Sequence, residues 1–251
     1  MPFRKTILIT GASSGLGAEM ARQFAARGHD LALCARRTDR LESLQAEITA
    51  DHPGRRVEVR ALDVTDDEVV FDVFRGFRED FGSIDRVVVN AGIGKGAPLG
   101  TGRYDANRAT ALTNFVAALA QIEAAMEVFR EQGAGHLVVV SSMSAMRGMP
   151  RSMTTYAATK AGVAMLAEGL RAELYGSSIK VSVIYPGYIA SEMNESVEQA
   201  TPLMVDTVKG VRSMVDAIEK EKGSACVPAL PWEPMKHLMK HAPLPLFRRI
   251  I

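Results

Sequence analysis

The chain has 251 residues, of which 47% are hydrophobic and 24% charged, the balance of an ordinary soluble globular domain. Its formal net charge of +1 provides no basic field for nucleic acid, so no nucleic-acid partner is expected. The two cysteines, Cys34 and Cys226, are too few for a disulfide scaffold and lack metal-ligand spacing, so no metal site is expected. We find no signal-peptide pattern and no apolar run of membrane-spanning length, and we therefore expect a cytoplasmic protein.

Short strands and helices are predicted to alternate along the chain. The strands are expected at Thr6–Thr10, Asp30–Ala35, Val57–Leu62, Arg86–Val89, His136–Ser141, Lys180–Tyr185 and Ala225–Val227. The helices are expected at Gly15–Arg27, Arg37–Asp51, Asp66–Phe81, Asn107–Gln132, Thr155–Gly176 and Val205–Lys222. Most strands lack polar–apolar alternation, which is typical of strands buried on both faces. The pattern predicts an α/β fold with one doubly wound parallel sheet of about seven strands, helices on both faces, and ligands beyond the strands' C-terminal ends.

A glycine-rich turn follows the first predicted strand and leads into a helix. It reads Thr10-Gly11-Ala12-Ser13-Ser14-Gly15-Leu16-Gly17. Glycines permit the tight turn and let the backbone approach a pyrophosphate, while amide N–H groups and the helix N-terminus face the anion. A glycine-rich turn without a ligand is the alternative, but the place at the first strand–helix junction favours a dinucleotide. The residues expected to contact it are Gly11, Ser13, Ser14, Gly15, Leu16 and Gly17.

The end of the second predicted strand carries arginines where an NAD-binding fold normally carries an acid. Arg36 and Arg37 follow Ala35 directly. A guanidinium group binds a 2′-phosphate through paired hydrogen bonds, whereas a carboxylate would repel it. The sequence therefore favours NADP(H) over NAD(H). The alternative is that the two arginines merely begin a solvated helix.

Tyr156 and Lys160 lie four residues apart and share one face of a predicted helix. A carbonyl reductase must deliver a proton as hydride arrives, and a free tyrosine with a pKa of about 10 is poorly matched to neutral pH. A nearby lysine cation stabilises the phenolate, so we expect it to lower the tyrosine pKa. On its own, such a pair is weak evidence for a catalytic site. It becomes stronger here because the pair follows the fifth predicted strand and the glycine-rich turn lies far upstream.

The turn T-G-x-x-x-G-x-G and the Tyr156-x-x-x-Lys160 pair resemble the short-chain dehydrogenase/reductase family, over nearly the whole chain to about residue 190. The resemblance implies a Rossmann-like fold and places Asp63 and Val64 against the adenine. It also assigns Asn90-Ala91-Gly92, after the fourth strand, to the cofactor site. Pro186-Gly187-Tyr188-Ile189-Ala190-Ser191 resembles the segment beside the nicotinamide, with Ile189 bonding the carboxamide through its backbone and Ser191 replacing the usual threonine. Pro186-Gly187 is equally typical of a strand's end.

The same resemblance assigns the catalytic roles. Tyr156 is the expected acid/base, and Lys160 tunes it and binds the nicotinamide ribose. Ser142 orients the substrate oxygen, and Asn114 supports a water relay. Ser142 lies fourteen residues before Tyr156 instead of the family's thirteen, so Ser141 and Ser144 compete for its role.

The predicted function is hydride transfer between NADP(H) and the carbonyl or alcohol carbon of an apolar small molecule. Methionines near the site favour an apolar pocket or, equally, packing of loop against core: Met143, Met146, Met149, Met153, Met193 and Met204. A non-catalytic nucleotide-binding regulator and a lipid-modifying reductase at a membrane surface are the alternatives. The resemblance suggests a homodimer or homotetramer through the helices Asn107–Gln132 and Thr155–Gly176.

We expect one catalytic domain over residues 1–227 and a proline-rich tail over residues 228–251. The tail carries four basic side chains against one acidic one, Glu233. In a helical tail Met235, Leu238, Met239 and Ala242 share a face that Lys236 and Lys240 flank. Such a surface suits peripheral contact with an anionic membrane. In the resembled family, tails instead often close over the substrate pocket or pack on a neighbouring subunit.

Overall fold

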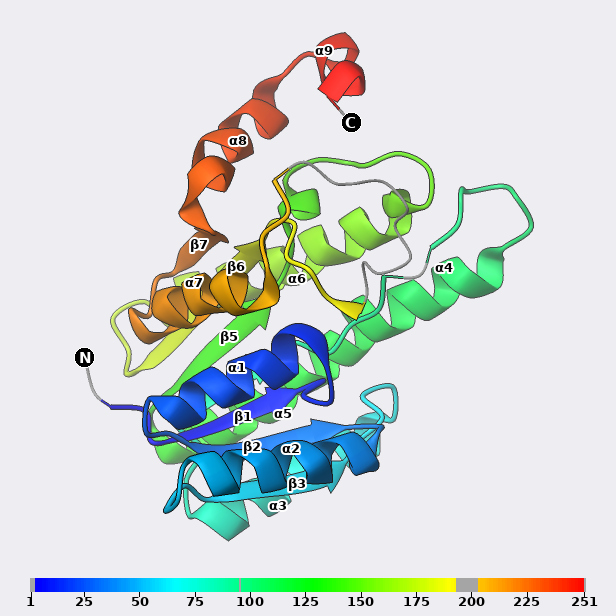
Figure 1. The fold of residues 1–251 in the computed structure, drawn as a ribbon. Helices are drawn as coiled ribbons and strands as arrows, with labels where there is room; N and C mark the ends of the chain where they lie inside the picture. Colours follow the sequence, from blue (N-terminus) through cyan, green and yellow to red (C-terminus); the bar gives the residue numbers. More distant parts are fainter. Residues whose placement is uncertain (1–2, 95, 193–202, 251) are drawn as a thin grey trace.

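Seven parallel strands form one sheet in the order β3-β2-β1-β4-β5-β6-β7 (Figure 1). The computed structural model describes residues 3–94, 96–192 and 203–250. The strands are β1 Thr6–Thr10, β2 Asp30–Ala35, β3 Val57–Ala61, β4 Arg86–Val89, β5 Gly135–Val140, β6 Ile179–Pro186 and β7 Ser224–Val227. The predicted doubly wound sheet is confirmed, with strand ends shifted by at most one residue.

Helices cover both faces of the sheet, which explains why its strands lack polar–apolar alternation. They are α1 Gly15–Ala26, α2 Thr38–Asp51, α3 Asp67–Phe81, α4 Tyr104–Ala111, α5 Ala117–Gln132, α6 Met153–Glu173 and α7 Thr207–Glu219. Ile7 and Ile9 of β1 belong to the core shared with α1, α2 and α7, while Leu8 belongs to the core shared with α3, α5 and α6. Alternate residues of one strand therefore enter different cores, and both sets are apolar.

The strand order reverses between β1 and β4. From β1 the chain moves outward through β2 and β3, then returns to place β4 on the other side of β1. The connections that leave the C-terminal ends of β1 and β4 consequently run to opposite faces of the sheet and open a crevice between them. This reversal positions the candidate site described below.

One long helical stretch departs from its prediction. It begins at Tyr104, not Asn107, and a π-helical turn at Leu112–Val116 separates α4 from α5. A π turn is invisible to helical periodicity because it adds one residue without ending the helix. By length and apolar composition Tyr104–Gln132 matches a membrane span, contrary to the expectation from sequence. Its apolar window is 61% buried inside the protein, as in the core helix of a soluble protein.

The predicted tail folds into two helices, α8 Ala229–His241 and α9 Leu244–Ile250, here called the C-terminal arm (Figure 1). Trp232 belongs to the core that includes Val163 of α6 and Val183 of β6, and Met235 and Met239 pack against that core, whereas Leu238 is 44% exposed. Most side chains of the helical face predicted from sequence therefore pack within the protein, and Leu238 is exposed to solvent. Membrane contact through the exposed remainder stays a prediction.

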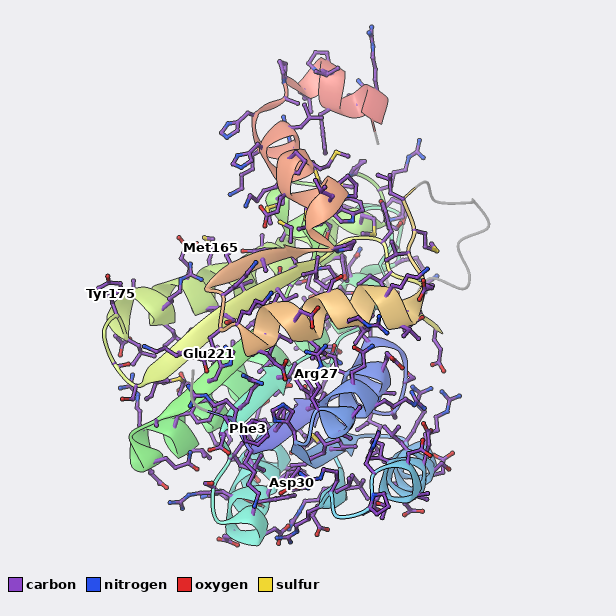
Figure 2. All side chains as sticks on the ribbon, turned by 60° about the vertical axis from the view of Figure 1, so that its left-hand side comes forward. Phe3, Arg27, Asp30, Met165, Tyr175 and Glu221 are labelled. Atoms are coloured by element: carbon purple, nitrogen blue, oxygen red, sulfur yellow. The ribbon has the colours of Figure 1, made fainter. Side chains whose placement is uncertain are left out.

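The expected homodimer or homotetramer also stays a prediction. Met165 on α6 and Tyr175, just beyond its end, are 60% and 92% exposed, and they project from the same side of the molecule (Figure 2). A contact between subunits along α6 would cover such side chains.

A buried polar cluster lies at the N-terminal edge of the sheet, away from the crevice, where Figure 2 labels Glu221. Arg86 of β4 donates from Nε to Nδ1 of His136 on β5, at 2.9 Å, and His136 Nε2 lies 2.8 Å from Ser182 Oγ on β6. Since Arg86 only donates, the ring is neutral with its proton on Nε2. Arg4 Nε lies 2.8 Å from Glu221 Oε1, which is 4.0 Å from His136 Nδ1. Burial first, then Arg86 and Arg4, lowers the pKa of His136 well below its usual value.

This neutral histidine predicts a loss of stability in acid. In the unfolded chain His136 binds a proton below a pH of about 6.5, whereas in the folded protein it does not. Its contribution to stability is thus complete above that pH and is lost as the pH falls, by up to about 1.4 kcal/mol per pH unit. His136→Asn keeps an acceptor for Arg86 but cannot titrate. Urea unfolding between pH 7.5 and 5 should show a shallower decline for this variant, and equal slopes would contradict the assignment.

Candidate active site

The turn after β1 is shaped by glycines that no other residue could replace. Gly11 has a φ of +64°, and a Cβ there would lie 2.9 Å from Ala91 Cα. A Cβ on Gly17 would lie 2.3 Å from the Gly11 carbonyl oxygen. Ser14 precedes α1 without capping it through its side chain, and α1 has no acidic residue in its first turn, within the described chain. The first amides of α1 therefore remain available to an anion, as a dinucleotide pyrophosphate requires.

Thr10 and Asn90 fasten this turn to the end of β4. Thr10 Oγ1 accepts hydrogen bonds from the backbone N–H groups of Asn90 and Ala91, at 3.0 and 3.1 Å. Asn90 Nδ2 donates to the Thr10 carbonyl oxygen at 3.0 Å. Asn90, predicted as a cofactor residue, thus holds the cofactor turn through its side chain. Thr10 was not singled out from sequence, because the hydroxyl's role depends on β1 and β4 being neighbours.

Arg36 and Arg37, at the end of β2, point to different partners. Arg37 reaches across the glycine turn and donates to Ser14 Oγ at 2.6 Å and Ser13 Oγ at 3.3 Å. Arg36 Nη1 lies 3.9 Å from Asp63 Oδ2, beyond β3. Burial alone would raise the pKa of Asp63, but hydrogen bonds from Thr65 and the charge of Arg36 lower it overall. Asp63 is therefore an anion at the adenine end of the predicted site, and its neighbour Val64 is buried.

Ser142, Tyr156 and Lys160 meet beyond the C-terminal end of β5. Tyr156 and Lys160 lie on α6, with Lys160 Nζ 5.9 Å from the centroid of the Tyr156 ring. Lys160 Nζ donates to the Val140 carbonyl oxygen at 3.0 Å, and a hydrogen bond joins Ser142 to Tyr156. The predicted trio is therefore assembled in one place.

The two competing serines have other partners. Ser141 Oγ is buried and donates to the Lys160 carbonyl oxygen at 2.7 Å. Ser144 donates to Ser142 Oγ from both its backbone N–H, at 3.2 Å, and its hydroxyl, at 3.0 Å. Of the three serines, only Ser142 hydrogen-bonds to the tyrosine within the described chain, and Ser144 orients Ser142.

The titration of Tyr156 differs from the expectation. Burial raises the pKa of Tyr156, and the hydrogen bond with Ser142 opposes this rise only in part. Burial also lowers the pKa of Lys160, to about 8. The expected lowering by the lysine is thus not found: burial dominates the pKa of Tyr156, and the Lys160 ammonium donates to the Val140 carbonyl oxygen. The phenol consequently holds its proton at neutral pH.

Asn114 lies in the π turn and is 1% exposed. Its Oδ1 accepts from the Ile93 N–H and its Nδ2 donates to the Ile93 carbonyl oxygen, both at 2.8 Å. A Cβ on Gly92 would lie 3.2 Å from Asn114 Oδ1 and 3.5 Å from Lys160 Nζ. Asn114 therefore fixes the loop after β4 beside Lys160, and the water relay implied by the resemblance stays a prediction.

The segment after β6 reaches the glycine turn. A Cβ on Gly187 would lie 2.0 Å from the Trp232 ring, so the C-terminal arm packs directly on this segment. Ile189 is buried and pairs with Val205, and Ser191 Cβ would lie 3.6 Å from a Cβ on Gly15. A pocket of about 430 Å³ opens there, lined by Gly15, Ser191 and Met204 among others.

Methionines predicted near the substrate divide between two roles. Met143 is 4% exposed and belongs to the core, and Met146 packs on that core. Met149 and Met153 are partly buried. Met204 lines the pocket, and Met193 lies outside the described residues. Packing therefore accounts for Met143 and Met146.

Known proteins resemble this chain in sequence and in fold. A family model for short chain dehydrogenases matches residues 5–202. An uncharacterized oxidoreductase of Mycobacterium tuberculosis is 54% identical over 246 residues, covering 98% of this chain and 97% of that protein. A short-chain dehydrogenase from Sphingobium yanoikuyae, solved with NADPH, is 29% identical with a TM-score of 0.82, covering 93% of this chain and 92% of that one.

A short-chain dehydrogenase/reductase from Burkholderia phymatum, solved with NAD, has a TM-score of 0.81, covering 94% of each chain. At 20% identity it speaks only to the fold. The protein is thus an oxidoreductase with a dinucleotide-binding fold. It belongs to the short-chain dehydrogenase/reductase family.

Two glycine-to-alanine variants test the close approach at the cofactor turn. Both Gly17 and Gly169 are helical, and alanine favours a helix by about 0.5–1 kcal/mol over glycine. Gly17→Ala should nevertheless lower the free energy of unfolding by about 1–3 kcal/mol and abolish tight NADPH binding, because its Cβ overlaps Gly11. At Gly169 no other described part of the chain comes within 4 Å of a Cβ, so that variant should gain stability and bind normally. Normal binding by Gly17→Ala would refute the packing.

Proposed function

We propose that this protein interconverts a carbonyl group and an alcohol on an apolar small molecule, with NADP(H) as its cofactor. The observation that carries the proposal is the meeting of Ser142, Tyr156 and Lys160 beside the glycine turn. A non-catalytic nucleotide-binding protein on the same fold would need the glycine turn but not these three side chains.

The residues of the turn fit a dinucleotide. Gly11 and Gly17 leave room for the backbone to approach a pyrophosphate, and the first amides of α1 face the place it would take. Ser191 lies beside Gly15 of this turn and Lys160 beside Gly92 after β4, and the nicotinamide half would be held between these segments. The bound nicotinamide would supply a hydride to the carbonyl carbon, or accept one from the alcohol carbon.

The chain's own residues handle the proton. The Ser142 hydroxyl donates a hydrogen bond to the substrate oxygen and fixes its distance from Tyr156. As the C=O bond is reduced, the substrate oxygen takes the proton of the Tyr156 phenol, and in the reverse direction the phenolate recovers it. The Lys160 ammonium, with its pKa near 8, remains cationic at neutral pH and stabilises the phenolate that forms.

Support for NADP(H) comes from the end of β2. Its last residue, Ala35, is followed by Arg36 and Arg37, and not by the acidic residue that in NAD-binding folds comes at the end of this strand. Arg37 is already directed at Ser13 and Ser14 of the cofactor turn. A guanidinium in that place attracts a 2′-phosphate.

Tyr156→Phe tests the reaction. Removing the phenol oxygen should lower kcat by at least about a hundredfold, because no other group donates the proton. The NADPH dissociation constant should change little, since the ring still fills its space. The kcat is measured by NADPH oxidation with aldehydes and ketones of graded size, and the NADPH dissociation constant is measured by fluorescence titration. Lys160→Ala should damage both, and a phenylalanine variant with most of its kcat would exclude the mechanism.

Arg37→Ala tests the cofactor. The variant should bind NADPH about ten- to a hundredfold more weakly, the loss of a charge-assisted hydrogen bond, while its affinity for NADH stays nearly constant. Arg36→Ala should have a smaller effect, because Arg36 lies near Asp63. Wild-type protein that binds NADH more tightly than NADPH would overturn the proposed cofactor.

A further inference from the structure

The carboxylate of Glu192, in the segment after β6, is held by two arginines of α2 and its N-terminal flank. Arg40 Nη1 lies 2.5 Å from Glu192 Oε1, and Arg37 Nη1 lies 3.2 Å from Glu192 Oε2. Arg37 immediately precedes α2 and Arg40 lies in its first turn. We call these three residues the Glu192 bridge. Neither Arg40 nor Glu192 was identified from sequence.

A third donor completes the surroundings of this carboxylate. Ser14 hydrogen-bonds to Glu192 and accepts from Arg37 Nη2 at 2.6 Å. Its hydroxyl therefore serves the bridge instead of capping α1, although serine is a favoured cap at that position. The hydrogen bond with Arg40 lowers the pKa of Glu192 most; burial opposes it, and the hydrogen bonds with Arg37 and Ser14 keep the pKa below its usual value. Two guanidinium groups and a hydroxyl thus converge on one anion.

The position of the Glu192 carboxylate is what connects it with the cofactor. In a doubly wound fold the adenosine ribose of a dinucleotide lies at the end of β2, next to the glycine turn. Arg37 extends from the residue pair that ends β2, and Ser14 belongs to the turn itself. Arg36, by contrast, lies 3.9 Å from Asp63 and takes no part in the bridge. The Glu192 carboxylate therefore sits where a group on the ribose 2′ position would reach.

We infer that Glu192 occupies the site of the cofactor's 2′-phosphate in the free protein, and that Arg40 is a further residue that selects NADP(H). The inference rests on the proposed function. On binding, the phosphate takes over the donors of Arg37, Arg40 and Ser14, and Glu192 leaves. A carboxylate and a phosphate cannot share these donors, because two anions in contact repel each other.

The bridge penalises NADPH but not NADH. NADH carries a neutral hydroxyl at the 2′ position, so it has no anion to compete with Glu192. The bridge is also exposed, with each of its side chains between 43% and 45% accessible, so it is a weak competitor that a phosphate can displace. Entry of NADPH exchanges a contact between α2 and the segment after β6 for one between α2 and the cofactor.

Glu192→Gln separates this competition from a general effect of charge. The variant should bind NADPH about two- to fivefold more tightly than wild type, the range of an exposed ion pair, and NADH equally well. The gain should shrink as salt is raised from 0.05 to about 0.5 M. Glu42→Gln is the matched control, because it removes the same charge from the exposed surface of α2, and among the described residues Glu42 makes no hydrogen bond or ion pair with the bridge. It should leave the NADPH dissociation constant within about 1.5-fold of wild type.

Arg40→Ala tests the other half of the inference. It should weaken NADPH binding several-fold, and in its background Glu192→Gln should gain less than in wild type, because Arg40 makes the shorter contact with Glu192. The dissociation constants are measured by fluorescence titration of NADPH and NADH with all four proteins of the cycle.

The outcomes distinguish the inference from the proposed function. If wild type prefers NADPH but Glu192→Gln binds it no better than Glu42→Gln does, the inference fails and the proposed function stands. If Glu192→Gln weakens NADH, the carboxylate binds ribose hydroxyls instead, and the inference is overturned. If wild type prefers NADH, the proposed cofactor and the inference fail together.

Discussion

The turn after β1 is packed so tightly, both within itself and against the residues that follow β4, that two of its positions have room for glycine alone. A Cβ on Gly17 would overlap the Gly11 carbonyl oxygen, and one on Gly11 would press on the Ala91 backbone. Thr10 and Asn90 close the remaining gap with hydrogen bonds between the two strand ends. The rest of the site inherits its geometry from this contact, because it fixes where α1 begins and how the loop after β4 leaves the sheet. Asn114 fixes the next part of the loop after β4, because its two hydrogen bonds with the Ile93 backbone hold that loop beside Lys160.

Burial, more than charge, sets the state of the catalytic residues before the cofactor binds. Lys160 and Tyr156 are both desolvated by the protein, which disfavours the charged form of each, so the pKa of Tyr156 rises while that of Lys160 falls to about 8. The result is a protonated phenol on the same helix face as an ammonium group that loses its proton more readily than a free lysine does. Under the proposed function, a positively charged oxidised nicotinamide would favour the phenolate, the base that alcohol oxidation requires. A neutral reduced nicotinamide would leave the phenol as the acid that carbonyl reduction requires. The same pair of side chains would then serve both directions of the proposed reaction.

The sequence predicted what depends on local patterns and missed what depends on three-dimensional neighbours. Apolar and β-branched runs located all seven strands, because most of them are buried on both faces; β3, at the edge of the sheet, instead alternates and is partly exposed. The glycine turn and the Tyr156–Lys160 pair were also readable, since each is contiguous or shares a helix face. The π turn at Leu112–Val116 was not, as it leaves the helical pattern nearly intact. Glu192 and Thr10 were missed because their partners lie 152 and 80 residues away. Among the residues that were missed, Arg40 could have been found from a local pattern, because it lies three residues after Arg37 at the start of a helix and so shares a face with it.

The C-terminal arm explains why the reaction class is readable while the substrate is not. Every residue assigned to the chemistry lies within residues 5–202, the part matched by the family model, and the arm lies beyond it. Yet the arm contacts both segments that flank the substrate side. Trp232 packs on Gly187, after β6, and Arg147, in the loop between Ser142 and Tyr156, donates to the Met239 carbonyl oxygen at 3.1 Å while its guanidinium lies 4.6 Å from the centroid of the Phe247 ring. The arm thus ties together the segment after β6 and the loop between Ser142 and Tyr156, although it lies outside the part of the chain that the family model matches. Under the proposed function, the last helices of the chain would therefore position segments near the substrate, while the motifs that indicate the chemistry all lie before them.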